Sequence, residues 1–559
     1  MRSPPSAPAS PRTPTADPTA PAGGGHRRPV VWALVALGAY LFVAGALLAW
    51  SAYEARQGLD ELDRLRAESG PQELLDGSAA SRIDEAGSRF SRAERLARNP
   101  VVIPLQILPM LGRQVRAVGA MAGAAEELTA VAGVGVDEAA ALAGDGLPTG
   151  GDRVEVLREL VDITDRAAAG LAVVDLGPAE ALIGPVGSAR DRFGAEKTAL
   201  EETLLDTRDA AQGMAGVFAG PSAYLLLAAN NAEMRAGAGM ALSAGLLTFE
   251  DGQVELGDMR TTSELQLPGG VDDYDEQFKA LWGFTNPDEE WRNLILSPRY
   301  PASASLGRDM WAALGQPEID GVLTVDLAAL QRLLGALGPV DVDGRRISAD
   351  NVVRLLQHDQ YVGVESDEQA ARRDQLGDVA GAVVDRLDMT SPDLAALVGG
   401  LRRAATGRHV MLWSDQRGLQ RAWEEIGVGG VLAADDVLVG VLNEGGNKLD
   451  QFLHVEAELQ SGPGRNGHLV MEVTNEVQPG EPAYISGASP DTGEGHGVYP
   501  GYLAASWPGG TEATVAEGSP ITLGGPDGES QFVAANVRIA PGETCGGCWT
   551  WWFRPRSSR

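Results

Sequence analysis

The stretch AYLLLAANNAEMRAGAGMALSAGLLTF, Ala223 to Phe249, holds two apolar runs separated by ten residues of a different character. Tyr224–Ala229 and Met240–Phe249 predict two buried β-strands, because short apolar runs bounded by Gly and Asn are typical of strands inside a core. The residues between them, NNAEMRAGAG at Asn230–Gly239, exceed the about two to five residues that a hairpin loop needs. They carry one Arg and spaced glycines, which indicates a loop whose backbone approaches another group closely.

Strand and helix signals alternate beyond this pair. Gly252–Asp258 completes a hairpin, Gly321–Asp326 predicts a buried strand, and Leu327–Gly338 predicts a helix that ends at Gly. This alternation predicts an α/β domain with a mixed sheet over residues 217–436. From residue 437 the pattern has a period of two, as in FLHVEAELQ at Phe452–Gln460, where Leu453 and every second residue after it share a face. We expect an all-β module over residues 437–559, in the form of a small β-sandwich.

The N-terminal segment PVVWALVALGAYLFVAGALLAW, Pro29 to Trp50, offers about 20 uncharged residues, enough to cross a bilayer as a helix. His26, Arg27 and Arg28 precede it, so the excess of positive charge places the N-terminus in the cytoplasm. Residues 1–28, rich in Pro and Ala, predict a disordered cytoplasmic tail. The core of a cleaved signal peptide is usually only about 7–15 residues long, so an uncleaved signal-anchor at residues 29–50 is favoured. We therefore expect a protein of the cell membrane whose chain lies outside the cytoplasm after residue 50.

Residues 51–216 predict an extracytoplasmic helical stalk or bundle. Apolar residues recur at helical spacing, as Ile83, Ala86, Phe90 and Ala93 do on one face. One segment differs, NPVVIPLQILPMLG at Asn99–Gly112, which is apolar and interrupted by three prolines. We expect it to be a buried connection between helices; insertion into the outer membrane leaflet beside the anchor is the alternative.

Composition and charge exclude several classes of protein. Lys and Arg number 45 against 77 Asp and Glu, a formal net charge of −32, which argues against a nucleic-acid partner because phosphates demand a basic surface. The six histidines are scattered and indicate no zinc site. The two cysteines, Cys545 and Cys548, lie on the outer side in this topology, where a local disulfide is stable.

Four segments resemble the bacterial envelope family called domain of unknown function 4012. They are AYLLLAANNAEMRAGAGM (Ala223–Met240), NPDEEWRNLILSPRYPASA (Asn286–Ala304), EIDGVLTVDLAALQRLLGALGPVDVDG (Glu318–Gly344) and NEGGNKLDQFL (Asn443–Leu453). The family name implies no activity.

The order of features is also distantly similar to that of the LytR-CpsA-Psr phosphotransferases, which have one N-terminal anchor and an extracytoplasmic α/β domain. That resemblance implies transfer of glycopolymers from prenyl-pyrophosphate carriers with a magnesium ion. It rests on an Arg-containing loop at Arg235 and a strand end at Arg260 in VELGDMRTT (Val254–Thr262). This chain has Ala236 and Thr261 where those enzymes carry acidic residues, so the expected metal ligands are missing.

The predicted ligand-binding residues are those that would hold an anionic head group, since Arg makes paired bonds to phosphate oxygens. They are Arg235, Arg260, Arg372 and Arg373, with Asn230 and Asn231 positioning the loop; Asp258 is the candidate metal ligand. For each Arg the alternative is an ion pair with a nearby carboxylate.

From these features we expect an anchored envelope protein whose α/β domain binds an anionic or prenyl-linked glycopolymer intermediate without full catalytic machinery. The alternative is a non-catalytic structural or assembly protein that binds protein partners or wall polymer. An active glycopolymer phosphotransferase is the weaker alternative, and only that reading brings in a magnesium cofactor.

Overall fold

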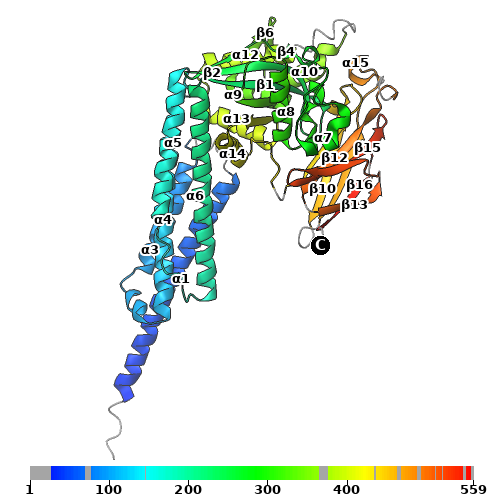
Figure 1. Cartoon of the computed structure of the whole chain (residues 1–559). Helices are drawn as coiled ribbons and strands as arrows, with labels where there is room; N and C mark the ends of the chain where they lie inside the picture. The colour runs from blue at the N-terminus through cyan, green and yellow to red at the C-terminus, as the bar shows by residue number, and fades with distance from the viewer. Residues whose placement is uncertain are drawn as a thin grey trace, which may run out of the picture. The chain divides into compact units, whose positions relative to one another are not determined.

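The computed structural model describes residues 27–68, 77–144, 146–363, 375–433, 436–461, 467–487, 493–509, 511–518, 520–545 and 549–555. The chain divides into two compact units, which we describe separately. The first comprises Met1–Leu59, Ser88–Glu126 and Asp175–Asp191, and the second comprises Asp60–Gly87, Glu127–Val174 and Arg192–Arg559. Figure 1 shows their helices and strands.

Long helices make up the first unit and continue into the second. They are α1 (Arg27–Glu68), α3 (Ala80–Ala97), α4 (Leu111–Gly144) and α6 (Gly184–Ala219); the second unit adds α5 (Gly151–Ala172). Small residues let the helices approach closely, because Ala44, Ala93 and Ala97 are fully buried. Ser51 Oγ donates to the Ala93 carbonyl over 2.7 Å, which joins α1 to α3. The predicted apolar helix near the N-terminus is confirmed, and most of the described residues between 51 and 216 are helical.

Two helices have the length and composition of a membrane span, and they differ in burial. In α1 the apolar stretch has a mean hydropathy of 1.9 and only 11% of it is buried within the molecule. The corresponding stretch of α4 has a mean hydropathy of 1.2 and is 44% buried. Phe42 of α1 is 78% exposed. Of the two, α1 is the helix whose apolar stretch is less buried within the molecule.

A mixed sheet forms the centre of the second unit. Its order is β3 (Gln253–Leu256), β2 (Gly239–Glu250), β1 (Ser222–Met234), β5 (Gly321–Asp326) and β8 (Val410–Ser414), and the short β4 (Arg260–Thr261) also pairs with β2. Strand β1 is parallel to β5, and the other pairs are antiparallel. The predicted mixed sheet is therefore confirmed.

Alternate residues of β1 face two different helical layers. Leu225 and Leu227 pack on one face against α7 (Glu276–Trp282), the 3-10 helix η4 (Trp291–Leu296) and α8 (Tyr300–Ala313). Leu226 lies on the other face with the ends of α5 and α6, α13 (Leu394–Thr406) and α14 (Arg417–Glu425). A further cluster on that face joins Ala228 to α9 (Leu327–Leu337), α10 (Val352–Gln357) and α12 (Gln375–Met389). The hairpin β6 (Val340–Val342) and β7 (Arg345–Ile347) follows α9.

The stretch NNAEMRAGAG is mostly strand, so the prediction of a ten-residue loop is wrong. Strand β1 runs on through Asn230 to Met234, and β2 begins at Gly239. The register between β1 and β2 shifts twice, once next to Ala228 and once between Asn230 and Met234. These bulges absorb the extra residues and leave only Arg235–Ala238 as the connection, closed by a 2.6 Å bond from Arg235 N–H to the Ala238 carbonyl.

Two four-stranded antiparallel sheets form the C-terminal part, as the period of two predicts. One is ordered β10 (Leu453–Ser461), β11 (Gly467–Asn475), β16 (Trp549–Pro555) and β13 (Thr511–Gly518). The other is ordered β14 (Leu523–Asp527), β15 (Ser530–Ile539), β12 (Tyr499–Pro508) and β9 (Leu438–Asn443), and a short helix α15 (Ala483–Ser486) lies between β11 and β12. Residues of β11, β12 and β15 share one core, which includes Val473, Leu503 and Val537. The edge strand β10 differs from that core: its side chains from His454 to Gln460 are all exposed, those of the predicted apolar face included.

Arg153 at the start of α5 holds three segments of the second unit together. Its side chain is fully buried and donates to the carbonyls of Pro148, Gly252 and Leu387 over 2.9 to 3.1 Å. Asp388 lies 3.4 Å from its Nη1. The turn between β2 and β3 and the end of α12 are thus tied to α5.

We expect Arg153→Met to lower the free energy of unfolding by about 3–5 kcal/mol, because buried carbonyls and a carboxylate would lose their donor. Urea unfolding followed by circular dichroism measures the change. Arg158→Met on the same helix is the matched control, since Arg158 is exposed and pairs only with exposed Glu155; its effect should stay within about 0.5 kcal/mol. Equal unfolding midpoints for the two variants would contradict the role of Arg153.

Candidate functional site

Glycines of the β1–β2 connection allow close backbone contacts within the chain itself. A Cβ atom on Gly237 would lie 2.3 Å from the Ser297 carbonyl oxygen, and one on Gly239 would lie 2.6 Å from the Asn230 carbonyl. Gly237 N–H also donates to the Ile295 carbonyl at 3.3 Å. The group that this backbone approaches is therefore the chain segment at the end of η4.

Arg235 is buried and bonded to backbone carbonyls. Its side chain is 7% exposed. Nε donates to Arg292 O at 3.1 Å, and Nη1 donates to Met234 O at 3.0 Å and to Asn443 O at 3.1 Å. Burial lowers the pKa of Arg235, and the nearby carboxylates of Glu233 and Asp450 partly offset that effect. The guanidinium thus joins the end of β1 to η4 and to β9.

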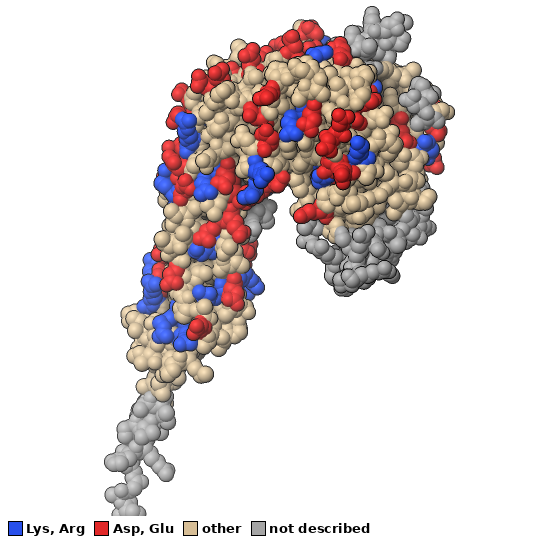
Figure 2. Space-filling view, in the orientation of Figure 1, with Lys and Arg blue, Asp and Glu red and all other residues tan. Residues whose placement is uncertain are grey.

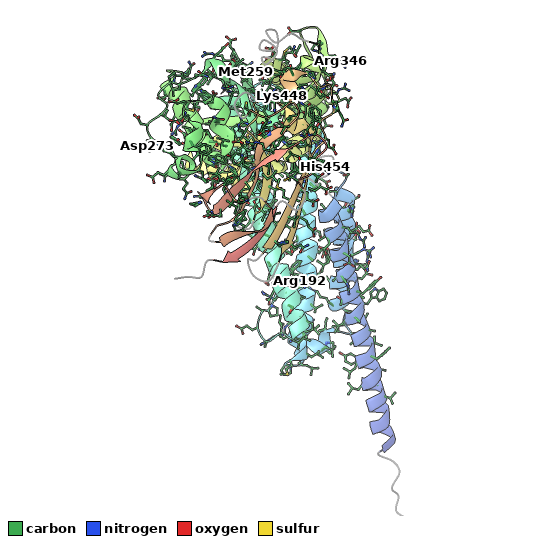
Figure 3. The ribbon with its side chains drawn as sticks, turned by 90° about the vertical axis from the view of Figure 1, so that its right-hand side faces the viewer. Arg192, Met259, Asp273, Arg346, Lys448 and His454 are labelled. Atoms are coloured by element: carbon green, nitrogen blue, oxygen red, sulfur yellow. The ribbon has the colours of Figure 1, made fainter. Side chains whose placement is uncertain are left out.

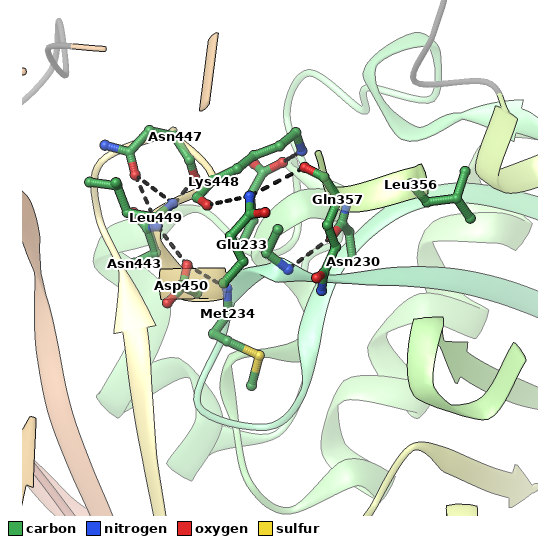
Figure 4. Close-up of polar contacts among 12 residues, drawn as sticks. Asn230, Glu233, Met234, Leu356, Gln357, Asn443, Asn447, Lys448, Leu449 and Asp450 are labelled. Carbon is green, nitrogen blue, oxygen red and sulfur yellow. Dashed lines mark hydrogen bonds and ion pairs between the residues drawn. The ribbon is translucent and has the colours of Figure 1, made fainter. Parts of the chain in front are cut away.

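Next to Arg235 lies a buried ion pair between Glu233 and Lys448 (Figure 4). Lys448 Nζ also lies 5.2 Å from the centre of the Tyr361 ring and 5.6 Å from that of Tyr484. Burial alone would lower the pKa of Lys448, but Glu233 outweighs it and holds the pKa above its ordinary value. The ammonium group is therefore held charged between one carboxylate and two aromatic faces.

Asp450 completes this buried junction. Its carboxylate accepts hydrogen bonds from Asn443 Nδ2 at 2.6 Å, from Met234 N–H at 3.1 Å and from the Tyr499 hydroxyl at 3.1 Å. Burial raises the pKa of Asp450 to about 7, against the opposing effect of these donors. We call Glu233, Arg235, Lys448 and Asp450 the junction residues, because they connect the end of β1 to the segment Asn443–Asp450.

A second polar group lies at the ends of β1 and β5, the parallel pair. Asp326 Oδ2 accepts from Asn231 Nδ2 at 2.7 Å and lies 2.7 Å from His409 Nδ1. Its Oδ1 caps α9 by accepting from the N–H groups of Ala328 and Ala329. The hydrogen bond to Asp326 raises the pKa of His409. The carboxyl ends of parallel strands are a common place for ligand sites, but here Asn231 and Asp326 are bonded to their own chain.

The remaining predicted site residues are not brought to the junction. Asn230 is buried and accepts a bond from Ala232 N–H at 2.8 Å. The side chains of Arg260 and Asp258 are exposed and make no hydrogen bond or ion pair with another described residue, although the backbone of Arg260 pairs with Ala244 of β2. Met259, which stands between Asp258 and Arg260 in the sequence, is labelled in the upper part of Figure 3, as is Lys448. Arg372 and Arg373 lie outside the described residues.

The predicted metal ligand and one of the two cysteines lie within the described residues. Among the described residues, no three His, Cys, Asp or Glu side chains are grouped to hold a metal ion. Asp258 as a metal ligand and Arg260 as a ligand-binding residue stay predictions. Cys545 is disulfide-bonded; the one other cysteine of the sequence, Cys548, lies outside the described residues.

Residues 219–361 match the model of a family described as "Protein of unknown function (DUF4012)". This segment belongs to that family. The DUF4012 segment extends from the end of α6 to Tyr361, so it includes the sheet strands β1, β2 and β5 and four residues of the two polar clusters, Asn231, Glu233, Arg235 and Asp326. Its description assigns no activity. No curated protein and no solved structure matches the chain.

Sequence reasoning missed Lys448, Asp450 and Asp326 as members of buried clusters. One signal was present: the chain has three lysines, Lys197, Lys279 and Lys448, and only Lys448 stands between Gly- and Asn-rich residues and an apolar run. No local pattern indicated that its partner is Glu233, because 215 residues separate the two.

Lys448→Met should lower the free energy of unfolding by about 3–5 kcal/mol, because Glu233 would stay buried without its cation. Adding Glu233→Met to that variant should restore part of the loss, and urea unfolding of both single variants and the double variant measures the coupling. The exposed pair Arg166 and Glu138 is the control, with a coupling below about 1 kcal/mol. Strictly additive losses at Lys448 and Glu233 would show that the pair does not act as a unit.

Asp450 predicts a pH dependence of stability. Its folded-state pKa of about 7 lies above the ordinary value, so its contribution is complete below about pH 4 and is lost as pH rises towards 7. The loss amounts to at most about 1.4 kcal/mol per pH unit. Asp450→Asn should make the fall in the urea midpoint between pH 5 and pH 7.5 shallower, whereas His409 and other titrating groups are common to both proteins. The same slope in the variant and the parent would refute the assignment.

Proposed function

We propose that the chain is a non-catalytic scaffold protein of the cell envelope, held in the membrane by α1, with the cytoplasm on its N-terminal side. The apolar stretch of α1 is long enough to cross a bilayer and exposes Leu37, Leu41, Phe42 and Val43. Exposed apolar residues over most of a helix's circumference suit lipid rather than water. Arg27 and Arg28 at its start support the orientation.

The observation that carries the proposal is the burial of Arg235. A cation that binds a head group needs free N–H donors at the protein surface. Arg235 is only 7% exposed, and its side chain donates three hydrogen bonds to backbone carbonyls. Lys448 is likewise committed to Glu233. The cations at the end of β1 therefore connect parts of the fold to one another. This is the role expected of such residues in a scaffold.

The C-terminal sheets supply the surface that the scaffold would present. We propose that they form a β-sandwich, since β11, β12 and β15 contribute to one core. Its edge strand β10 pairs only with β11 and exposes Val455 and Leu459. An exposed strand edge with unpaired backbone groups is suited to adding a strand from a partner protein.

A second candidate is the binding of an anionic or prenyl-linked glycopolymer intermediate. One observation favours it: Arg260 is exposed and has no partner among the described residues. A Cβ atom on Gly377, in the first turn of α12, would lie 2.8 Å from Met259 Cβ, so the start of α12 lies close to Arg260 in space. The distant similarity to LytR-CpsA-Psr phosphotransferases, with magnesium as cofactor, belongs to this candidate alone.

Calorimetry with a short-chain prenyl pyrophosphate, with and without magnesium, separates the two candidates. The full chain in lipid nanodiscs should give only the heat of dilution, and Arg260→Ala should give the same trace. Saturable binding that Arg260→Ala abolishes and the control Arg158→Ala retains would overturn the scaffold proposal in favour of the second candidate. Binding that requires magnesium would point further, to the phosphotransferase.

The orientation has its own measurement. In intact bacterial cells that produce the full chain, a membrane-impermeant maleimide should label Ser263→Cys, an exposed position of the second unit. Labelling that appears only after the cells are lysed would refute an extracytoplasmic location.

A further inference from the structure

The connection between α3 and α4 in the first unit is an apolar loop in which some side chains are buried and others are exposed. Residues Asn99–Leu111 include no charged residue. Val102 and Leu105 are buried, whereas Ile107 is 82% exposed and Met110 is 87% exposed. The sequence-based expectation of a buried connection is therefore wrong for the second half of the loop. Its cause is the 3-10 helix Ile103–Ile107, which turns Leu105 inwards and leaves Ile107 outside.

This loop packs against the apolar part of α1. Val102, Leu105 and Val115 form one cluster with Ala44, and Tyr40, Leu47 and Leu48 of α1 line it. Ala44 is six residues before Trp50, where the apolar run of α1 ends, and at 1.5 Å per residue this corresponds to about 9 Å. Interfacial segments bury their apolar side chains about 5–10 Å deep in a bilayer. The loop thus lies at the depth that an interfacial segment occupies.

The backbone of the loop has few N–H groups that need a hydrogen bond to water. Its three prolines have no N–H group, and the N–H of Val101 donates to the Asn99 side chain. The N–H groups of Val102, Ile103, Leu105, Leu108 and Gly112 donate to carbonyls within the segment. The Gln106 carbonyl accepts from Arg116 Nη1 at 2.8 Å. Internal satisfaction of polar groups is the condition for irregular backbone to enter the hydrocarbon boundary.

Basic residues border the loop although the chain as a whole is strongly acidic. Between Ser88 and Glu126 there are six Arg residues and two Glu residues, and Arg98, Arg113 and Arg116 are the nearest to the loop. Figure 2 shows an uncharged surface at the lower end of the helices, with Lys and Arg side chains above it among some Asp and Glu side chains. An apolar tip bordered by cations matches a bilayer with anionic head groups.

The connection before α6 adds one more apolar residue to this surface. Ile183 is 57% exposed, and its N–H donates to Gln114 Oε1 at 3.0 Å. Gln114 Nε2 in turn donates to the Ala181 carbonyl at 3.0 Å. These two bonds hold Ile183 beside the first turn of α4.

We propose that Ile107, Leu108, Met110, Leu111 and Ile183 form a membrane-docking surface that enters the outer leaflet of a phospholipid bilayer beside α1. The occupant is lipid, because the surface continues the exposed apolar surface of α1 and lies at the same level. The inference rests on the proposed anchoring of α1. Docking at a second place fixes the first unit against the membrane, which a single helix alone does not do.

Spin-label accessibility in nanodiscs that contain phosphatidylglycerol tests the proposal on the full chain. Single labels would be placed through Ile107→Cys and, as a second loop position, Met110→Cys. Cys545 is disulfide-bonded and does not react with the label. Phe42→Cys reports on the anchor, and Val134→Cys is the matched control, since Val134 is 59% exposed on α4 and lies about 34 Å along the helix from Leu111.

Labels at 107, 110 and 42 should collide with oxygen at least about threefold more often than with a water-soluble nickel chelate, and the label at 134 should show the reverse. Nickel accessibility at 107 and 110 equal to that at 134, with lipid exposure at 42, would overturn the docking surface and leave the anchor intact. Low accessibility to both reagents would overturn it in favour of a protein neighbour. Nickel accessibility at 42 would refute the anchor itself.

Discussion

The buried ion pair between Glu233 and Lys448 is the interaction on which the arrangement of the second unit depends. A charge that leaves water costs several kcal/mol, and only a partner with good geometry compensates for it. Lys448 has that partner in Glu233, together with the faces of Tyr361 and Tyr484. Because one charge comes from β1 and the other from the segment before β10, the pair is satisfied only when these parts are in place.

The same constraint explains the neighbouring polar groups. Arg235 saturates carbonyls at Arg292 and Asn443, and Asp450 receives donors from Met234 and Tyr499. Each of the four junction residues thus bonds to a segment distant in sequence. This connectivity makes the end of β1 rigid, in agreement with a role in holding parts of the chain together. The matched family segment ends at Tyr361, so its junction residues find their partners beyond it.

The first unit differs from the second, because it packs long helices together and also leaves large apolar side chains exposed. Close contact is achieved with small residues such as Ala44, Ala93 and Ala97. Larger apolar side chains are left outside at Phe42, Ile107 and Met110. Large apolar side chains exposed in this number are unusual for a soluble bundle, where such residues fill the interior. The proposed docking surface rests on that group of exposed residues rather than on any single one.

The sequence by itself determined the elements whose signals are local. The apolar length of α1, the strand Gly321–Asp326, the helix Leu327–Leu337 ended by Gly338 and the period of two after residue 437 were all predictable, since each depends on neighbours within one segment. Tertiary structure alone decided the rest. It extended β1 through Asn230 by means of bulges and paired Glu233 with Lys448 across 215 residues. It also buried Arg235, which the sequence predicted as a ligand-binding cation, and bonded it to the carbonyls of Arg292 and Asn443. Burial and pairing are properties of groups that meet only after the chain has folded, so a pattern along the sequence does not reveal them.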